Sequence, residues 1–303
     1  MRRLGVLGLF DENDAESRAE FTAFREALGK LGWTDGRNLR IDYRWVAGQV
    51  ARIDSLAKDL VALRPEVILC RSTPVTAAVL KETRTIPIVF MVVSDPVGDG
   101  LVASFARPGG NVTGFTNVEA SLGGKWLELL KELAPRVTRI SVMFNPKTSP
   151  GGGFYYWRLV ENAAASFPVK VTATTIQDAA KIEHAIIAFA REPGGGLLVL
   201  PDITNLTHRG LISSLAERHR LPAIYSWRFM PKAGGLISYG VDYIDLYRRA
   251  ASYVDRILRG AKPSELPVQA PVKFELIINR KTAKALGLAV PQSLVLRADE
   301  VIE

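Results

Sequence analysis

The chain of 303 residues is 48% hydrophobic and 23% charged, and its formal net charge at pH 7 is +8. This composition excludes an intrinsically disordered chain, and the length suffices for one large hydrophobic core or for two smaller ones. Lysines and arginines are scattered among acidic residues without a long basic run, so the positive charge does not indicate nucleic-acid binding.

Cysteine content and hydropathy bear on the compartment. The single cysteine, Cys70, cannot form an internal disulfide and ends an apolar run, so we expect a buried thiol that fits a reducing or an oxidising compartment equally. No stretch is long and apolar enough to span a membrane. Residues 1–3 lead directly into the first predicted strand, so we expect no signal peptide within this chain.

In the first part of the chain, short apolar strands alternate with helices whose apolar residues recur three or four positions apart. In the second strand, Arg40, Asp42 and Arg44 alternate with apolar residues, which indicates one exposed face and a place near the sheet edge. The predicted elements are strand 4–10, helix 21–31, strand 39–45, helix 53–63, strand 66–70, helix 73–84 and strand 88–93.

The alternation restarts near Thr116, which predicts a second lobe of the same kind. Its predicted elements are helix 122–133, strand 139–144, helix 155–165, strand 169–174, helix 179–190, strand 197–200, helix 207–218 and strand 222–225. Helix 243–258 is expected back in the first lobe, and strand 272–279 with helix 280–286 on the second. These breaks predict three crossings, near residues 111–116, 238–240 and 260–271.

The alternation of strands and helices predicts an α/β fold with parallel sheets, and such sheets bind ligands beyond the carboxyl ends of their strands. The residues that follow each predicted strand should therefore line the pocket, and all of them can form hydrogen bonds. In the first lobe they are Glu12, Asn13, Ser72, Thr73, Ser94 and Asp95, and in the second they are Asn145, Asp202 and Tyr225.

These positions also have purely structural interpretations. Thr73, followed by Pro74, is a suitable N-cap for the next helix, but the same hydroxyls and unpaired amides suit a ligand carboxylate. Asp95 fits an Asx turn as well as a partner for a ligand ammonium, and Asp202 has the same two interpretations. Aromatic residues beside the loops could stack on a flat ligand or pack in the core. The aromatic candidates for pocket walls are Tyr155, Tyr225 and Tyr239.

Motifs that carry catalysis are missing from the sequence. Gly5 and Gly8 do not complete a dinucleotide-binding turn, and there is no phosphate-binding P-loop or nucleophile elbow. The histidines at positions 184, 208 and 219 lack metal-ligand spacing. We therefore expect no catalytic residue, no metal site and no cofactor.

The run from Thr85 to Thr116 resembles a bacterial family of ABC-transporter substrate-binding proteins that includes tryptophan and other aromatic amino-acid binders. The run holds an apolar strand, then Ser94-Asp95-Pro96, and then Arg107-Pro108-Gly109-Gly110 before Asn111-Val112-Thr113-Gly114. Matching segments cover essentially the whole chain in order. They are Leu31-Gly32-Trp33, Gly36-Arg37-Asn38, Phe144-Asn145-Pro146, Leu200-Pro201-Asp202, Gly234-Gly235-Leu236, and the tail from Phe274 through Lys281-Thr282-Ala283 to Ala298-Asp299-Glu300.

The resemblance implies a type I periplasmic-binding-protein fold, with two Rossmann-like lobes joined by three hinge crossovers and a ligand cleft between them. We assign residues 1–114 and 240–262 to lobe one, and residues 115–239 and 263–303 to lobe two. The resemblance also points to amino acids or aromatic carboxylates as ligands, although it does not identify one. Within that class, the hydrogen-bonding loop residues and the three tyrosines above are the expected ligand contacts.

The expected function is non-catalytic: hinge closure on a small molecule and its delivery to an ABC permease, by a protein that is monomeric by default and works outside the cytoplasm. Family members are normally exported, so a signal peptide is expected to have been trimmed or to be encoded upstream. One alternative is a cytosolic sensor or repressor core, disfavoured because no helix-turn-helix precedes Leu4. The other is a two-lobed transferase-like enzyme, disfavoured because the chain lacks a nucleophile–base pair.

Overall fold

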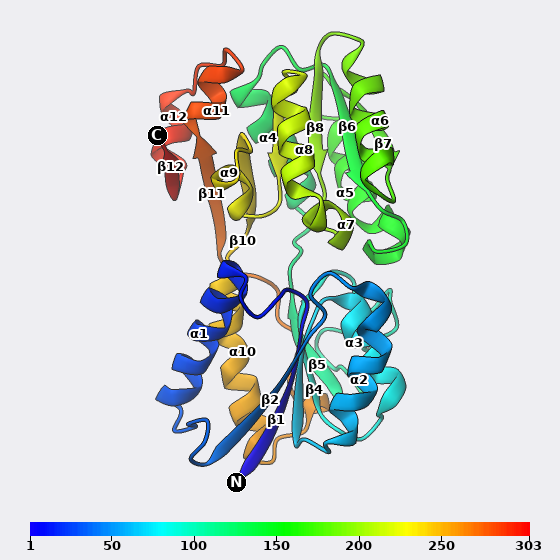
Figure 1. Cartoon of the computed structure of the whole chain (residues 1–303), viewed down its shortest axis with the longest axis vertical. Helices are drawn as coiled ribbons and strands as arrows, with labels where there is room; N and C mark the ends of the chain where they lie inside the picture. Colours follow the sequence, from blue (N-terminus) through cyan, green and yellow to red (C-terminus); the bar gives the residue numbers. More distant parts are fainter. The chain divides into compact units, whose positions relative to one another are not determined.

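The computed structural model describes residues 1–149 and 151–303 in full and the backbone of residue 150. The chain divides into two compact units (Figure 1). Unit 1 consists of Met1–Val118 and Asp242–Val272, and unit 2 consists of Glu119–Val241 and Lys273–Glu303. The chain therefore passes between units after Val118, Val241 and Val272.

The segment 263–271, which the sequence assigns to lobe two, lies in unit 1. Hydrogen bonds to the last strand of that unit hold it there. The Thr113 hydroxyl donates to the Leu266 carbonyl at 2.6 Å, and the Gln269 amide donates to the Gly114 carbonyl at 2.9 Å. Buried and exposed residues alternate along this segment, and the backbone groups on its buried side need such partners.

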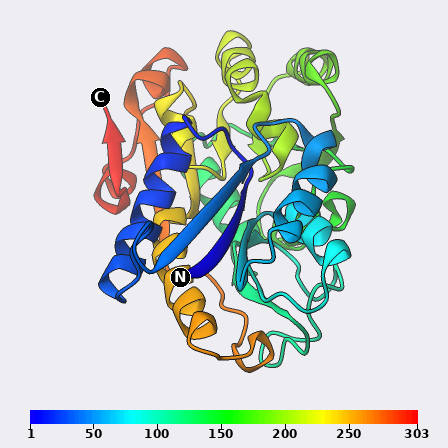
Figure 2. The same ribbon diagram turned by 60° about the horizontal axis from the view of Figure 1, so that its bottom comes forward.

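Unit 1 is built on a five-stranded parallel sheet of order β2-β1-β3-β4-β5. Helices α1 and α10 lie side by side against one face of the sheet, and α2 and α3 cover the other face (Figures 1 and 2). The elements are β1 (Arg2–Gly8), α1 (Ala15–Lys30), β2 (Leu39–Trp45), α2 (Ile53–Ala62), β3 (Val67–Arg71), α3 (Thr73–Glu82), β4 (Ile88–Val93), β5 (Val112–Thr116) and α10 (Tyr243–Leu258).

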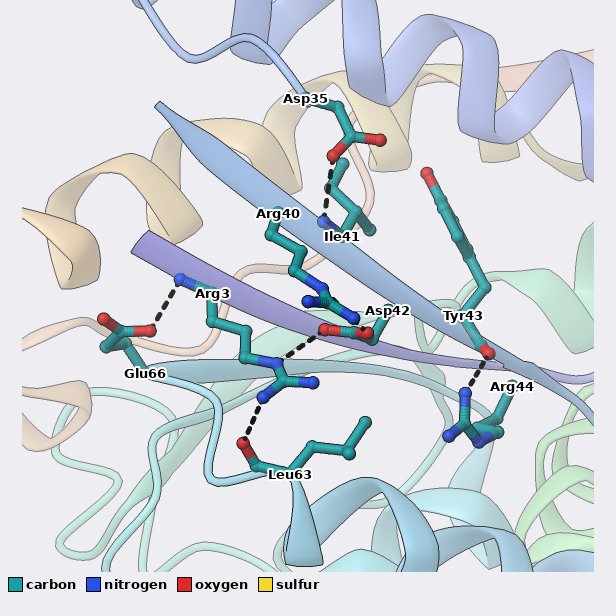
Figure 3. A network of polar contacts seen from close by, with 9 residues as sticks. All are labelled: Arg3, Asp35, Arg40, Ile41, Asp42, Tyr43, Arg44, Leu63 and Glu66. Carbon is teal, nitrogen blue, oxygen red and sulfur yellow. Dashed lines mark hydrogen bonds and ion pairs between the residues drawn. The ribbon is translucent and has the colours of Figure 1, made fainter. Parts of the chain in front are cut away.

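Strand β2 forms the edge of this sheet, as its alternating sequence predicts, but Asp42 is not on a solvated face. Its carboxylate accepts hydrogen bonds from Arg3 Nε at 2.7 Å and from Arg40 Nε at 3.3 Å, and its side chain is only 12% exposed (Figure 3). The hydrogen bond from Arg3 is the main cause that lowers the pKa of Asp42. A polar residue on an edge strand is thus tied to the neighbouring strand β1.

Unit 2 is built on a seven-stranded sheet of order β12-β11-β10-β9-β8-β6-β7. Helix α4 packs against α5, and α6 packs against α8. The elements are α4 (Leu122–Leu133), β6 (Arg139–Phe144), α5 (Phe154–Ala164), β7 (Lys170–Thr175), α6 (Ala179–Ala190), β8 (Gly195–Val199), α7 (Ile203–Thr207), α8 (Arg209–Arg218), β9 (Ala223–Tyr225), α9 (Phe229–Lys232), β10 (Ile237–Val241), β11 (Phe274–Asn279), α11 (Arg280–Ala285), α12 (Gln292–Arg297) and β12 (Glu300–Ile302).

The prediction of purely parallel sheets is wrong for one pair, because β11 runs antiparallel to β10. The chain leaves unit 2 at the end of β10 and re-enters at the start of β11, and Val241 pairs with Phe274 at that point. Since no crossover helix carries the chain back to the opposite end of the sheet, β11 has to run in the reverse direction. The α/β class with two predominantly parallel sheets is otherwise confirmed.

No helix in the described part of the chain combines the length and the apolar character that crossing a bilayer requires.

Candidate functional site

The carboxyl ends of β3 and β4 in unit 1 are held in an unusual backbone conformation. Ser72 has φ of 86° and Val92 has φ of 59°, and the pairing of β4 with β5 shifts register between Met91 and Val93. The Ser72 amide donates to the Met91 carbonyl at 2.9 Å, which fastens the two strand ends together. Residues other than glycine at such φ values cost about 1–3 kcal/mol each, and they concentrate at ligand-binding sites.

This backbone places Ser72 and Thr73 at the start of α3. The expectation that Thr73 is the N-cap is wrong: Ser72 occupies the cap position, Thr73 is the first helical residue, and neither side chain caps the helix. Both hydroxyls are buried and have no hydrogen-bond partner among the described residues. Burying an unpaired hydroxyl is costly, so two of them beside the unpaired first amides of a helix indicate a place for an external acceptor.

The other predicted residues of unit 1 differ in their surroundings. The Ser94 hydroxyl is buried and donates to Asn117 Oδ1 at 3.0 Å. Asp95 is half-buried, and its Oδ1 accepts from the Gly98 amide at 2.8 Å, so it makes the turn contact that was one of its two interpretations. Asn13 is exposed, in the loop that follows β1.

A buried ion pair that the sequence did not suggest lies next to Ser72. Arg71 donates to Glu20 of α1 at 2.9 Å, and both side chains are 3% exposed. The Arg71 guanidinium also lies over the rings of Phe10, at 4.3 Å, and Tyr243, at 5.3 Å. Burial raises the pKa of Glu20, and the charge of Arg71 opposes that rise. The signal for it in the sequence is Glu20, a charged residue on the apolar face of α1. Single charged residues occur on the apolar faces of many helices, so this one did not indicate an ion pair.

In unit 2, Asp202 joins the loops that follow β6 and β8. Its carboxylate accepts from the amides of Asn205, at 2.9 Å, and Asn145, at 2.8 Å, and from the Ser149 hydroxyl at 3.2 Å. Burial raises the pKa of Asp202 to about 6, and these donors oppose the rise. The side chain of Asn145 is also engaged, because its Nδ2 donates to Thr204 Oγ1 at 2.7 Å. Both residues thus fix the shape of these two loops.

The three predicted tyrosines of unit 2 differ in exposure. Tyr225 is fully buried in β9, and burial raises its pKa to about 12. Tyr155 is half-buried and meets Tyr156 edge-on, with ring centroids 5.7 Å apart. Tyr239 is half-buried and stacks on Phe274 at 5.7 Å. Only Tyr155 and Tyr239 therefore offer ring surface to a molecule in solution.

The predicted site residues thus divide equally between the units, five in each; eight follow or end a strand, whereas Tyr155 lies at the start of α5 and Tyr239 in the middle of β10. Unit 1 holds Asn13, Ser72, Thr73, Ser94 and Asp95, and unit 2 holds Asn145, Tyr155, Asp202, Tyr225 and Tyr239. Among the described residues no group of three or more histidine, cysteine or acidic side chains could hold a metal ion.

Residues 11–302 match the sequence model of a family described as ABC transporter substrate binding protein. The chain belongs to this family. The match covers almost the whole sequence, and it confirms the resemblance drawn from the run that contains Ser94-Asp95-Pro96.

Similar proteins include other substrate-binding proteins. A tyrosine-binding protein of Clostridioides difficile is 31% identical over 265 residues, which are 88% of this chain and 75% of that protein. Two crystal structures each cover 99% of this chain and 99% of their own. One is a conserved domain protein from Vibrio cholerae, with 29% identity and a TM-score of 0.89. The other is an ABC domain from Streptococcus pneumoniae in complex with L-Trp, with 24% identity and a TM-score of 0.91. These likenesses confirm the type I binding-protein fold of this substrate-binding protein.

Proposed function

We propose that this substrate-binding protein captures an amino acid with an aromatic side chain and delivers it, chemically unchanged, to the permease of an ABC importer. The observation that carries the proposal is the pair of buried, unpartnered hydroxyls of Ser72 and Thr73 at the start of α3. Membership of the substrate-binding family supports transport over catalysis. The tyrosine-binding relative supports the ligand class.

In this proposal the ligand carboxylate accepts hydrogen bonds from Ser72, Thr73 and the first amides of α3, where the helix dipole favours a negative charge. Asp95 is the partner of the ligand ammonium, because it is the predicted acidic residue with accessible surface. Tyr155 and Tyr239 offer ring faces to the aromatic side chain. Asn13 and Ser94 complete the contacts from unit 1, while in unit 2 Asn145 and Asp202 fix the loops that carry the site, and Tyr225, which is fully buried, makes no direct contact.

The ligand binds between the two units and shifts them towards a closed arrangement, because only that arrangement lets it contact both. The segments that connect the units, at residues 118–119, 241–242 and 272–273, take up the motion. The protein works outside the cytoplasm as a monomer, and it has no catalytic, cofactor-binding or nucleic-acid-binding role.

A thermal-shift screen against the common amino acids tests the ligand class. A ligand that binds only the folded protein stabilises it by about 2.7 kcal/mol at a concentration 100 times its dissociation constant. L-tyrosine or L-tryptophan should therefore raise the melting temperature by several degrees and be recovered unaltered, whereas L-serine and L-glutamate should not. If no amino acid raises the melting temperature, or if the ligand is recovered chemically changed at catalytic rates, the proposal fails.

A further inference from the structure

Unit 1 contains a pocket of about 280 Å³ between α1 and the edge strand β2, and none of the ten residues assigned to the amino-acid site above lines it, although Glu12 of its lining precedes Asn13 in the chain. We call it the α1–β2 pocket. Helix α1 contributes Ser17, Arg18, Phe21 and Arg25, strand β2 contributes Tyr43 and Trp45, and the preceding loop contributes Glu12. The volume is close to the lower end of the range for small-molecule sites, so it suits a ligand of one or two rings.

Three aromatic rings form a corner in this pocket. Tyr43 and Trp45 are two positions apart on β2, so they lie on the same face of the sheet, where they stack at 5.5 Å with an interplanar angle of 6°. Phe21 meets both rings edge-on, at 5.8 Å and 5.0 Å. No further strand covers this sheet edge, and Tyr43 and Trp45 are only half-buried. Flat apolar surface therefore remains open to a planar molecule.

The polar groups of the pocket favour an anion. Arg18 and Arg25 are exposed at the rim and form no ion pair among the described residues, and Glu12 is the acidic residue in the lining of the pocket. Burial raises the pKa of Tyr43, the charge of Arg25 opposes that rise and the charge of Asp35 adds to it, and the Tyr43 hydroxyl has no hydrogen-bond partner among the described residues. The two guanidinium groups supply more positive charge than Glu12 neutralises.

Ser17 is the group in this pocket that most needs a partner. Its side chain is 0% exposed, and its hydroxyl makes no hydrogen bond within the described part of the chain. It lies one helical turn before Phe21, on the same face of α1. A buried hydroxyl without a partner is uncommon in native proteins, and a ligand acceptor would remove its cost.

We propose that the α1–β2 pocket binds a small planar aromatic molecule with one carboxylate, at a site separate from that of the transported amino acid. The ring lies in the corner formed by Phe21, Tyr43 and Trp45. The carboxylate accepts hydrogen bonds from Arg18 or Arg25, and Ser17 donates a further one. The inference goes beyond the transport function and holds whichever amino acid the protein transports.

Isothermal titration of the intact protein with indole-3-acetate tests this site, with the uncharged indole-3-acetamide as the matched ligand. The acid should bind saturably, and the amide about tenfold more weakly, because it lacks the charge that the arginines recognise. Arg25→Gln and Arg18→Gln should each weaken binding of the acid by about tenfold, with unchanged melting temperatures. Arg52→Gln, also an exposed arginine of unit 1 but outside the pocket, should change little.

Ser72→Ala distinguishes this site from that of the proposed function. It should leave the binding of indole-3-acetate unchanged, because Ser72 does not line the α1–β2 pocket. If Ser72→Ala abolishes binding while the two pocket variants retain it, the compound occupies the amino-acid site and the inference is overturned. Equal weakening of binding by Arg52→Gln would show that the arginines act only through the net charge of the protein, and this would overturn the inference. The absence of any binding of indole-3-acetate at millimolar concentration would overturn it as well. A negative amino-acid screen would leave this titration interpretable, because its probe and its variants are different.

Discussion

Ser72 has a strained backbone, and both Ser72 and Thr73 carry buried hydroxyls that have no hydrogen-bond partner among the described residues. Without a partner these hydroxyls destabilise the folded protein, and in the proposed function the ligand carboxylate accepts hydrogen bonds from them. Ser72→Ala and Thr73→Val should therefore weaken binding of the amino acid by about tenfold each and leave stability unchanged or slightly higher. Isothermal titration and urea unfolding of the same samples would measure both effects.

The matched control for Ser72→Ala is Ser55→Ala, an exposed serine of α2 whose hydroxyl donates to the Arg52 carbonyl. It should leave affinity unchanged. Unaltered affinity in Ser72→Ala and Thr73→Val would remove these residues from the binding site. Asp42→Ala would be a poor control, because its carboxylate is paired with Arg3 and its loss would affect stability.

Asp202 should make the stability of the protein depend on pH. Burial raises its folded-state pKa to about 6, so the folded protein holds this proton more tightly than the unfolded chain, whose pKa is about 4. Its contribution to stability is therefore complete below about pH 4 and is lost as the pH rises through about 6. Asp202→Asn keeps a capping side chain for α7 but does not titrate.

The free energy of unfolding of the parent protein should thus fall relative to that of Asp202→Asn by on the order of 3 kcal/mol between pH 4 and pH 7. Urea unfolding of the two proteins at pH 4, 5, 6 and 7 would measure this difference, in which the other titrating groups cancel. A constant difference across the series would show that the pKa of Asp202 is not raised.

At the scale of single residues the sequence predicted positions better than roles. The rule that ligands bind beyond the carboxyl ends of strands placed Ser72 and Thr73 correctly at the start of α3. It could not show that Asn145, Ser149 and Asn205 all donate hydrogen bonds to the Asp202 carboxylate, or that Tyr225 is fully buried. Those outcomes depend on partners distant in sequence, as does the ion pair of Arg71 with Glu20.

Helices α4 and α5 of unit 2 pack so closely that one glycine is required at their contact. A Cβ at Gly123 would overlap the backbone of Leu159, whereas at Gly124 the nearest atom would be the Ala163 Cβ at 3.7 Å. Gly123→Ala should therefore destabilise the protein by roughly 1–3 kcal/mol, and Gly124→Ala should stabilise it by up to about 1 kcal/mol through helix propensity.

These two variants are each other's control, because they make the same change at neighbouring positions of α4. Urea unfolding would measure the difference between them. Equal stabilities would contradict the close contact between α4 and α5.

At the scale of elements, the long apolar runs and helical stripes predicted most strands and helices of both units. Residues 111–116 and 238–240 were expected as crossings between the lobes, but they form strands β5 and β10, and the chain crosses just after each of them; β12 was not predicted. The short helices α7, α9 and α12 were missed, because four to six residues are too few to show a period. Strand β11 was predicted, but its antiparallel direction was missed for a different reason. Its direction follows from where the chain re-enters unit 2, which no local pattern records.

At the scale of the whole molecule, the restart of the strand–helix alternation predicted two units, and the division differs mainly in the segment 263–271. The chain passes between its units three times, and in the proposed function these three connections take up the change in their arrangement. Capture and delivery by such a protein require that the ligand favours one arrangement over another.

Small-angle X-ray scattering with and without ligand tests this central claim most directly. At saturating L-tyrosine or L-tryptophan, whichever raises the melting temperature more, the radius of gyration should decrease and the scattering profile should change shape. L-serine at the same concentration should leave the profile unchanged, as should the aromatic amino acid added to Ser72→Ala at a concentration that saturates only the parent protein. An identical profile for the free and the saturated parent protein would contradict a binding protein that closes on its ligand.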